Sequence, residues 1–376
     1  MLEETTSPTQ QQLNKSSSGL NKSSNGLNKS TSGLRNSRSG GNLQVLVHDY
    51  TPTLNENETA HQIKSTKGKY NITCYERKGH LCGAVNSPVL ITYHDLGLNH
   101  VSCFNSFFDQ PKVRCILPYL HIIHIEAPGH EYNAQTIDSD DYPTMQEMAE
   151  DVLDVIEYFK VKQFIGMGAG AGGGVLTQFT VDHPRYVLGL ILIGSDIKSF
   201  SWLETVKQWV GFNSIPSHKN PNSVKNYLLN HYYSENMEET NPDLREHLKR
   251  DMEMINPENM CHYVGSFLKR KDISQSLIKS LSCKVLVIVG KDSSVSDDVI
   301  EVFSHFNPRY STMLQIPDCG ILVSAEKPTM MVEPFKLFMQ GLGYLLNYYA
   351  SIGDSQEILP PSTINNSQEM NLPQQI

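Results

Sequence analysis

A glycine-rich turn is the segment of this sequence whose residue types and spacing most clearly suggest chemistry. Residues 166–174 read Gly-Met-Gly-Ala-Gly-Ala-Gly-Gly-Gly and lie between an apolar run and a helical pattern. Six glycines among nine residues indicate a backbone that needs positive φ angles or a very close approach to its neighbours. A turn of this kind can present a nucleophile above a sheet, or it can bind phosphate at a helix N-terminus.

One interpretation of the turn is a dinucleotide-binding loop. Gly168, Gly170 and Gly173 fit the Gly-x-Gly-x-x-Gly spacing, and Asp196 ends the next strand, where an acid can bind ribose. However, the turn follows roughly the third strand of the predicted domain, whereas that fingerprint normally follows the first. A dinucleotide-binding protein therefore remains an alternative, and no cofactor is predicted.

A second interpretation is the nucleophile turn of the α/β-hydrolases, Gly-x-Ser-x-Gly. Alignment on the preceding strand places Gly168 at the nucleophile position, whereas counting back from Pro184 places Gly170 there. The sequence leaves both registers open. In either register the position is a glycine, which has no side chain that could attack a carbonyl carbon.

The other two members of a Ser-His-Asp triad are also missing. The segment Pro317-Asp-Cys-Gly-Ile follows the last strand and has Ile321 at the position of the histidine base. The position of the acid falls at Ser293, with Asp292 one place early. The Ser-His-Asp mechanism cannot operate without a nucleophile and a base, so the sequence predicts that the protein has no catalytic residues and is not an enzyme.

Several polar residues near the predicted strand ends could still bind or react. Tyr93-His94-Asp95 occupies the place of the oxyanion loop, where hydrolases commonly have His-Gly, and His130 follows a later strand. We take His94, Asp95 and His130 as candidate crevice residues. Ser195 beside Asp196 is an alternative nucleophile, so a hydrolase with a noncanonical site remains the main competing hypothesis.

The elements that must position these residues follow a strand–helix–strand pattern. Apolar, β-branched runs without alternation are typical of strands buried on both faces of a parallel sheet. Thr144 and Glu147 form a capping box that begins an amphipathic helix. The expected strands are Val89–Thr92, His121–Ala127, Gln163–Met167, Leu188–Ile193, Lys284–Val289 and Met313–Ile316. We predict an α/β-hydrolase-like domain over residues 43–350, mostly parallel, with helices on both faces and a helical cap inserted at 197–281.

Both ends of the chain differ from this domain in composition. Residues 1–42 contain Leu-Asn-Lys-Ser repeats every seven residues, with a Gly in each that disfavours a coiled coil. Residues 351–376 are polar with two adjacent prolines. We predict two disordered tails. The first has five basic and two acidic residues, so weak peripheral contact with an anionic membrane is one hypothesis, and Ser37 and Ser39 are candidate phosphorylation sites.

Composition excludes several classes of protein. The chain has 376 residues and a net charge of −9, which argues against nucleic-acid binding. No apolar run is long enough to span a bilayer, and no secretory signal is recognisable. The seven cysteines form no C-x-x-C pair, which predicts reduced thiols in the cytoplasm and no metal site.

The predicted domain contains six colinear motifs: Leu90–His100, Glu126–Gly129, Gly166–Gly172, Ile288–Ser294, Asp318–Gly320 and Pro334–Tyr344. Together these motifs resemble the NDRG (N-myc downstream-regulated) family over residues 65–346. The resemblance implies an α/β-hydrolase fold without hydrolase activity, in a cytoplasmic protein of signalling, growth, differentiation or stress response that acts through protein partners. The partners stay unidentified.

Overall fold

The computed structural model describes residues 58–82, 87–198, 220–232 and 242–345. Both predicted tails, with Ser37 and Ser39, lie outside the described residues, as do the remaining parts of the chain.

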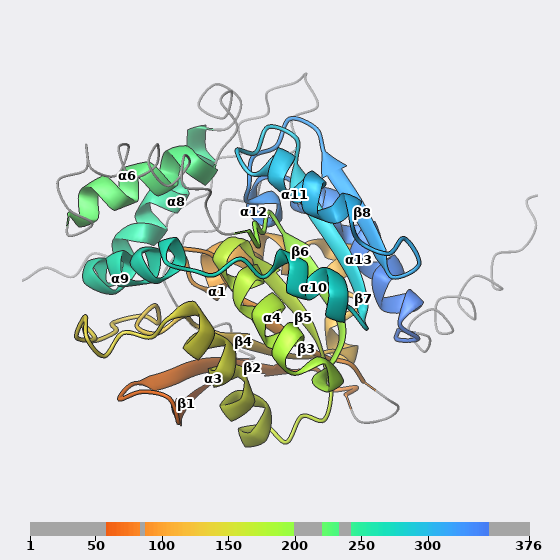
Figure 1. Ribbon diagram of the computed structural model, residues 1–376, viewed down its shortest axis with the longest axis horizontal. Helices are drawn as coiled ribbons and strands as arrows, with labels where there is room; N and C mark the ends of the chain where they lie inside the picture. The colour runs from red at the N-terminus through yellow and green to blue at the C-terminus, as the bar shows by residue number, and fades with distance from the viewer. Residues whose placement is uncertain (1–57, 83–86, 199–219, 233–241, 346–376) are drawn as a thin grey trace, which may run out of the picture. The chain divides into compact units, whose positions relative to one another are not determined.

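The described residues form an eight-stranded sheet with the order β1-β2-β4-β3-β5-β6-β7-β8 (Figure 1). β1, β2 and β4 pair antiparallel, and all pairs from β4 to β8 are parallel. The strands are β1 (Thr59–Lys64), β2 (Asn71–Lys78), β3 (Val89–Tyr93), β4 (His121–Ile125), β5 (Phe164–Ala169), β6 (Val187–Ile193), β7 (Lys284–Gly290) and β8 (Ser311–Ile316).

The six parallel strands, β3 to β8, confirm the predicted runs to within a few residues at each end. For the inner strands the reason is burial on both faces: every residue of β5 is buried, as are six of the seven in β7. The edge strand β8 is less buried, with only Ile316 fully enclosed. The β1–β2 hairpin was not predicted, because its strands mix polar and apolar residues without a clear period. Ser65 and Tyr70 connect it to helix α3 (Met145–Tyr158) by donating hydrogen bonds of 2.6 Å each to the buried carboxylate of Asp151.

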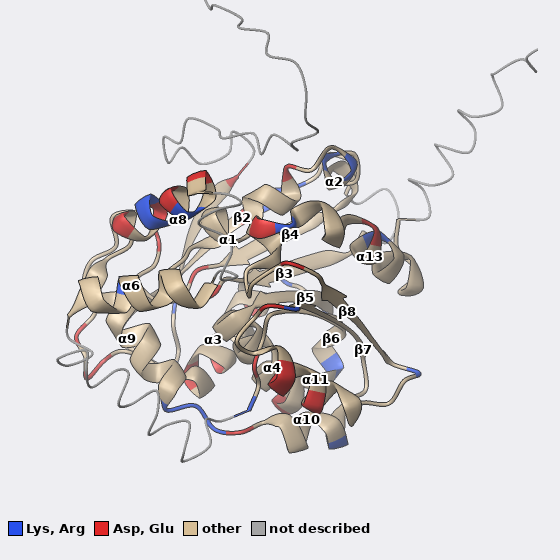
Figure 2. Ribbon diagram, turned by 90° about the horizontal axis from the view of Figure 1, so that it is seen from above, with Lys and Arg blue, Asp and Glu red and all other residues tan. Residues whose placement is uncertain are grey.

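Helices cover both faces of the sheet. Figure 2 shows α1 and α13 on one side of the strands and α3, α4, α10 (Ser274–Ser280) and α11 on the other. The helices outside the β6–β7 connection are α1 (His100–Phe108), α2 (Pro111–Arg114), η1 (Leu117–Tyr119), α3 (Met145–Tyr158), α4 (Gly170–Asp182), η2 (Pro184–Tyr186), α11 (Ser296–Ser304), α12 (Val323–Glu326) and α13 (Pro328–Gly341).

The helix predicted from its capping box is α3. The Thr144 side chain accepts a hydrogen bond from the backbone N–H of Glu147, and the Glu147 side chain accepts one from the backbone of Thr144. Its apolar stripe, which includes Met148 and Val152, is buried against the sheet and α4. Local capping and burial of one face therefore favour the same element.

The described part of the chain between β6 and β7 is helical and contains no strand. Its helices are α6 (Pro221–Tyr232), α8 (Pro242–Met254), α9 (Pro257–Leu268) and α10 (Ser274–Ser280). α6, α8 and α9 lie together beside the body in both ribbon views (Figures 1 and 2). A buried ion pair of 2.7 Å between Arg270 and Asp196 joins the exit of this insertion to the segment after β6. The fold is thus an α/β sheet with a helical insertion, as the sequence predicted.

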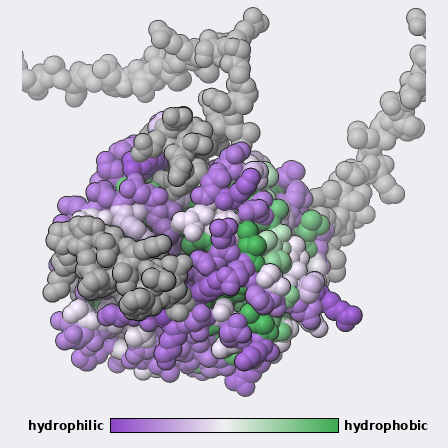
Figure 3. Space-filling view, turned by 45° about the horizontal axis from the view of Figure 1, so that its top comes forward, coloured by the Kyte–Doolittle hydropathy of each residue, from purple (hydrophilic) through white to green (hydrophobic). Residues whose placement is uncertain are grey.

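The described surface is mixed in character. Acidic and basic residues are interspersed along the ribbon (Figure 2), and the face in Figure 3 is mostly hydrophilic with a hydrophobic area on one side. No helix among the described residues is long and apolar enough to cross a membrane.

Candidate functional site

The sharp turn between β5 and α4 lies at Gly170. Its φ of +46° is in the left-handed region, and it is the first residue of α4. A Cβ atom built on Gly170 would lie 1.9 Å from Oδ2 of Asp95, so that carboxylate fills the space of a side chain. Gly168 is inside β5, and a Cβ there would lie 2.4 Å from the backbone of Gly173. Of the two open registers, therefore, only Gly170 lies at the turn.

Asp95 binds the backbone groups around this turn. Its Oδ1 accepts hydrogen bonds from the N–H of Leu96 at 2.7 Å and from the N–H of Ala171 at 2.8 Å. The side chain is buried, with 4% exposure. In a serine hydrolase, the developing oxyanion is held by the backbone N–H of the residue after the nucleophile and by an N–H of a loop that follows a neighbouring strand. The corresponding donors in this chain already hold a carboxylate.

Burial and hydrogen bonding oppose each other at Asp95. Loss of hydration raises its pKa, and the N–H groups of Ala171 and Leu96 limit that rise by favouring the ionised form. Tyr232 packs beside the same loop and donates a hydrogen bond to the carbonyl of Leu96. The loop is thus held from the sheet side and from α6.

A pocket of about 210 Å³ lies beside this turn, between the strand ends and the helices α6 and α9. Asp95, Gly170 and Ile321 all line it. Asp292 is exposed in the loop after β7, and Ser293 is buried with its hydroxyl oxygen accepting the N–H of Val295. The pocket therefore brings together the positions that the sequence assigned to a nucleophile and a base, and neither bears a reactive group.

A larger cavity of about 1030 Å³ lies beside α3, α4 and α9. Its lining residues include neither Asp95 nor Gly170 nor Ile321. The residues that the sequence comparison with hydrolases singled out, Gly170 and Ile321, therefore lie at the smaller pocket and not at the larger cavity.

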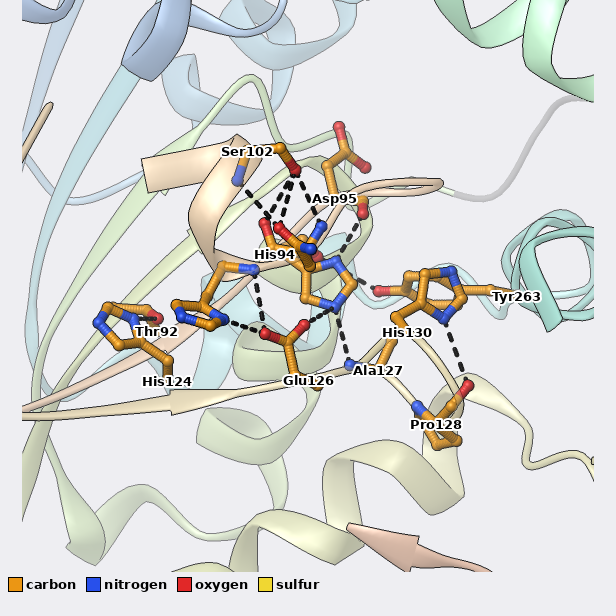
Figure 4. Close-up of polar contacts among 12 residues, drawn as sticks. Thr92, His94, Asp95, Ser102, His124, Glu126, Ala127, Pro128, His130 and Tyr263 are labelled. Carbon is orange, nitrogen blue, oxygen red and sulfur yellow. Dashed lines mark hydrogen bonds and ion pairs between the residues drawn. The ribbon is translucent and has the colours of Figure 1, made fainter. Parts of the chain in front are cut away.

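Buried histidines and glutamates lie behind the oxyanion loop (Figure 4). His94 donates from Nδ1 to the carbonyl of Asp95 at 2.7 Å, and its Nε2 accepts the N–H of Ala127 at 2.8 Å. Glu126 contacts Nδ1 of His100 through Oε1 and lies 3.0 Å from Nε2 of His94 through Oε2. Figure 4 shows the Asp95 carboxylate turned away from Glu126, so the cluster supports the loop and does not share the pocket.

Charge at the cluster concentrates on His100 and Glu126. Burial alone would lower the pKa of His100, but Glu126 and Glu58 outweigh it and raise that pKa to about 9. Burial likewise opposes ionisation of Glu126, and the charge of His100 reverses this and holds the pKa of Glu126 well below its usual range. This pair is a charged structural contact in the protein interior.

His130 and His124 are neutral members of the cluster. Burial and a neighbouring histidine lower the pKa of each to about 3. The His130 ring lies 5.4 Å from that of His94, centroid to centroid, and both residues have 0% exposure. His94 and His130 were predicted to line the crevice, but the structure places both in the interior. Of the three candidate crevice residues, only Asp95 lines the pocket.

Two serines near the pocket, Ser195 and Ser294, are poorly placed to act as an alternative nucleophile. Ser195 is buried, and its hydroxyl donates toward the backbone carbonyls of Ile193 and Gly168. Ser294 lies 3.2 Å from Nδ1 of His231, and both residues line the small pocket. Burial lowers the pKa of His231 to about 4, which makes it a weak proton acceptor near neutral pH.

Within the described ranges, no group of histidine, cysteine or acidic side chains is arranged to hold a metal ion. All seven cysteines are free thiols; five are buried, Cys82 is half-buried and Cys115 is exposed.

Comparison with known proteins decides the family. Residues 60–346 match the model of the Ndr family. The chain belongs to the Ndr family. An NDRG-like protein of Dictyostelium discoideum is 56% identical over 315 residues, which cover 84% of this chain and 95% of that protein. Protein NDRG1-A of Xenopus laevis is 31% identical over 320 residues, covering 81% of this chain and 74% of its own.

Solved structures similar to this Ndr-family chain are α/β-hydrolases. A thermophilic esterase from Thermogutta terrifontis aligns with a TM-score of 0.63 at 18% identity, covering 76% of this chain and 99% of that one. An esterase from Exiguobacterium antarcticum aligns with a TM-score of 0.60 at 15% identity, covering 75% and 100%. At such low identity the likeness establishes the α/β-hydrolase fold, and the predicted family and fold class are confirmed.

Sequence reasoning missed two features of this Ndr-family site. The first is the bond of Asp95 to Ala171, 76 positions along the chain; its only sequence signal is an Asp where hydrolases commonly have Gly. The second is the pairing of His100 with Glu126, which depends on α1 packing beside the end of β4. Neither contact follows from local periodicity.

Proposed function

We propose that this chain is a non-catalytic member of the α/β-hydrolase fold that acts through protein interactions in cytoplasmic signalling. The observation that carries the non-catalytic part is Asp95, whose carboxylate occupies the two N–H donors that an oxyanion would need. Gly170 at the turn and Ile321 in the same pocket supply neither nucleophile nor base. An active hydrolase would need free N–H donors in place of those bound by Asp95, a nucleophile in place of Gly170 and a base in place of Ile321.

The register of the nucleophile turn belongs to this proposal. Gly170 occupies the nucleophile position, because its positive φ and its place at the start of α4 are those of a nucleophile on a strand-to-helix turn. Gly168 and Gly172 then take the small-residue positions of Gly-x-Ser-x-Gly. Ser293 and Asp292 remain candidates for the vestigial acid position.

The same carboxylate argues against dinucleotide binding. A pyrophosphate would need the N–H groups at the start of α4, and Asp95 already accepts from Ala171 there. Asp196, the candidate ribose acid, forms an ion pair with Arg270 instead.

A residual hydrolase is the second candidate, favoured by the contact of Ser294 with His231. Against it stand the low pKa of His231 and the lack, among the described residues, of a carboxylate that bonds to this imidazole. A panel of short-chain esters tests both candidates with the full-length protein. The proposed function predicts turnover at the buffer rate for wild type and Ser294→Ala alike; turnover that Ser294→Ala abolishes would establish the second candidate.

The interaction part of the proposal needs its own experiment. Affinity capture from the native cell, with full-length protein compared with a chain lacking residues 1–42, would find partners and assign them to the body or the tail. Asp substitution of Ser37 and Ser39 should weaken contacts made by the basic tail, because phosphate-like charge offsets its Lys and Arg. Unchanged partners and unchanged location in both comparisons would contradict a role for the tail.

A further inference from the structure

The pocket beside Gly170 combines a buried carboxylate with apolar walls. Asp95 lines it from the oxyanion loop and Tyr227 from α6. The apolar part of its lining includes Leu96, Val264, Phe267, Leu268, Val295 and Ile321. An anionic group among apolar side chains selects a ligand that carries a positive charge and a hydrocarbon part.

The charges around the pocket single out Asp95. Two other carboxylates line it, and each already has a cation: Asp196 pairs with Arg270 at 2.7 Å, and Asp298 pairs with Lys198 at 3.1 Å. Among the described residues, no lysine or arginine forms an ion pair with Asp95. Its partners are the backbone N–H groups of Leu96 and Ala171 and the hydroxyl of Tyr232, which are neutral donors and leave the net charge of the carboxylate in place.

We propose that this pocket binds a small alkylammonium ion, with the ammonium group against Asp95 and the alkyl chain among the apolar walls. The proposal rests on the proposed function, since a site without nucleophile or base can bind such a molecule and leave it unchanged. A volume of about 210 Å³ corresponds to about seven water molecules, which suits an amine of roughly five to seven non-hydrogen atoms. Butylammonium is the probe of matching size.

Anions of the same length should be excluded. The N–H donors that would bind a carboxylate are occupied by Asp95, and a second carboxylate beside it would be repelled. The imidazole of His231 is neutral near pH 7, so it neither repels a cation nor attracts an anion strongly. Butylammonium, 1-butanol and butyrate thus form a matched series that differs mainly in charge.

Asp95→Asn is the decisive variant. The asparagine oxygen can still accept from Leu96 and Ala171, so the loop keeps its anchor while the charge is lost. Asp297→Asn is the control, because Asp297 is an exposed aspartate of α11 that does not line the pocket. Thermal unfolding of both variants reports whether they remain folded.

Calorimetric titration of the full-length protein with the three compounds tests the proposal. We expect saturable binding of butylammonium, binding of 1-butanol and butyrate weaker by about tenfold or more, and a similar loss in Asp95→Asn but not in Asp297→Asn. Equal binding of the three compounds, tighter binding of butyrate, or no saturable binding of butylammonium by wild type would overturn it. The wild-type series decides the matter even if Asp95→Asn fails to fold. Ester turnover is a separate readout, so failure of this proposal leaves the non-catalytic account standing.

Discussion

Substitution of Gly170 by serine should be strongly destabilising, and removal of Asp95 should relieve much of the cost. A Cβ atom added at Gly170 would fall 1.9 Å from Oδ2 and 2.0 Å from Cγ of Asp95, far inside contact distance. Forcing extra atoms into a packed interior typically costs about 1–3 kcal/mol. The left-handed φ of +46° adds about 1–2 kcal/mol for a residue with a Cβ. We therefore expect Gly170→Ser to lower the free energy of unfolding by about 2–5 kcal/mol.

The double variant separates these two causes. Asp95→Ala alone leaves the buried N–H groups of Leu96 and Ala171 unpaired, at about 1–3 kcal/mol for each that no water reaches. In that background Gly170→Ser should cost only the φ contribution, because the clash is gone. The coupling free energy between the two sites should then be about 1–3 kcal/mol in favour of the double variant.

Urea unfolding of the four proteins measures this coupling, provided that the slope with denaturant stays constant. Gly174→Ser is the matched control: a Cβ there would meet only Met145 at 3.7 Å, an ordinary contact, and its φ is not positive. The control should change stability by less than about 1 kcal/mol. Additive effects of Gly170→Ser and Asp95→Ala, within about 0.5 kcal/mol, would refute the contact on which the site is built.

Three further predictions concern the supporting contacts. Folding raises the pKa of His100 to about 9, so the stabilising contribution of this residue is complete below the unfolded pKa near 6.5 and is lost as pH rises through about 9. In urea unfolding, the wild-type free energy of unfolding should fall by up to about 3 kcal/mol over that pH range. The His100→Gln variant should lose less over the same range. Asp151→Ala should cost roughly 2–4 kcal/mol, because two buried hydroxyls lose their acceptor; a change below about 1 kcal/mol in the same assay would contradict this. Thr144→Ala should cost about 0.5–2 kcal/mol through loss of the α3 cap, with an unchanged thermal midpoint as the opposing result.

Restored chemistry is a separate test of the register. Asp95→Ala, Gly170→Ser and Ile321→His together empty the anion-binding N–H groups and add a hydroxyl and an imidazole at the same pocket. We expect weak ester hydrolysis that disappears when residue 170 is returned to glycine. The same set built on Gly168→Ser should fold poorly, since a Cβ there meets the backbone of Gly173. Activity from the Gly168 set and none from the Gly170 set would reverse the assignment.

The parts of this structure that could be predicted from the sequence are those that local patterns determine. Strands β3 to β7 contain continuous apolar runs because both of their faces are buried, and the start of α3 is marked by Thr144 and Glu147. Ile321 could be proposed for the position of the base because it stands in a recognisable segment after the last strand. Each of these depends on neighbouring residues in the chain.

The remaining features depend on contacts between distant segments. The choice between Gly168 and Gly170 needed a φ angle, and the contact of Asp95 with Ala171 needed the loop and the start of α4 placed together. His94 and His130 were expected in a crevice because they follow strand ends, yet the packing of Tyr263 beside both rings encloses them. Burial at a strand end is set by the helices above it, which local sequence does not specify.

In the proposed assignment, Asp95 takes the place of the oxyanion and Gly170 that of the nucleophile, so this fold should carry no reactive hydroxyl. Intact-mass measurement after incubation with a fluorophosphonate probe tests this most directly. We predict no mass increase for the full-length protein and stoichiometric labelling of an active esterase treated in parallel. A single adduct on Ser195 or Ser294, formed by the folded protein and absent when the protein is denatured before labelling, would contradict it.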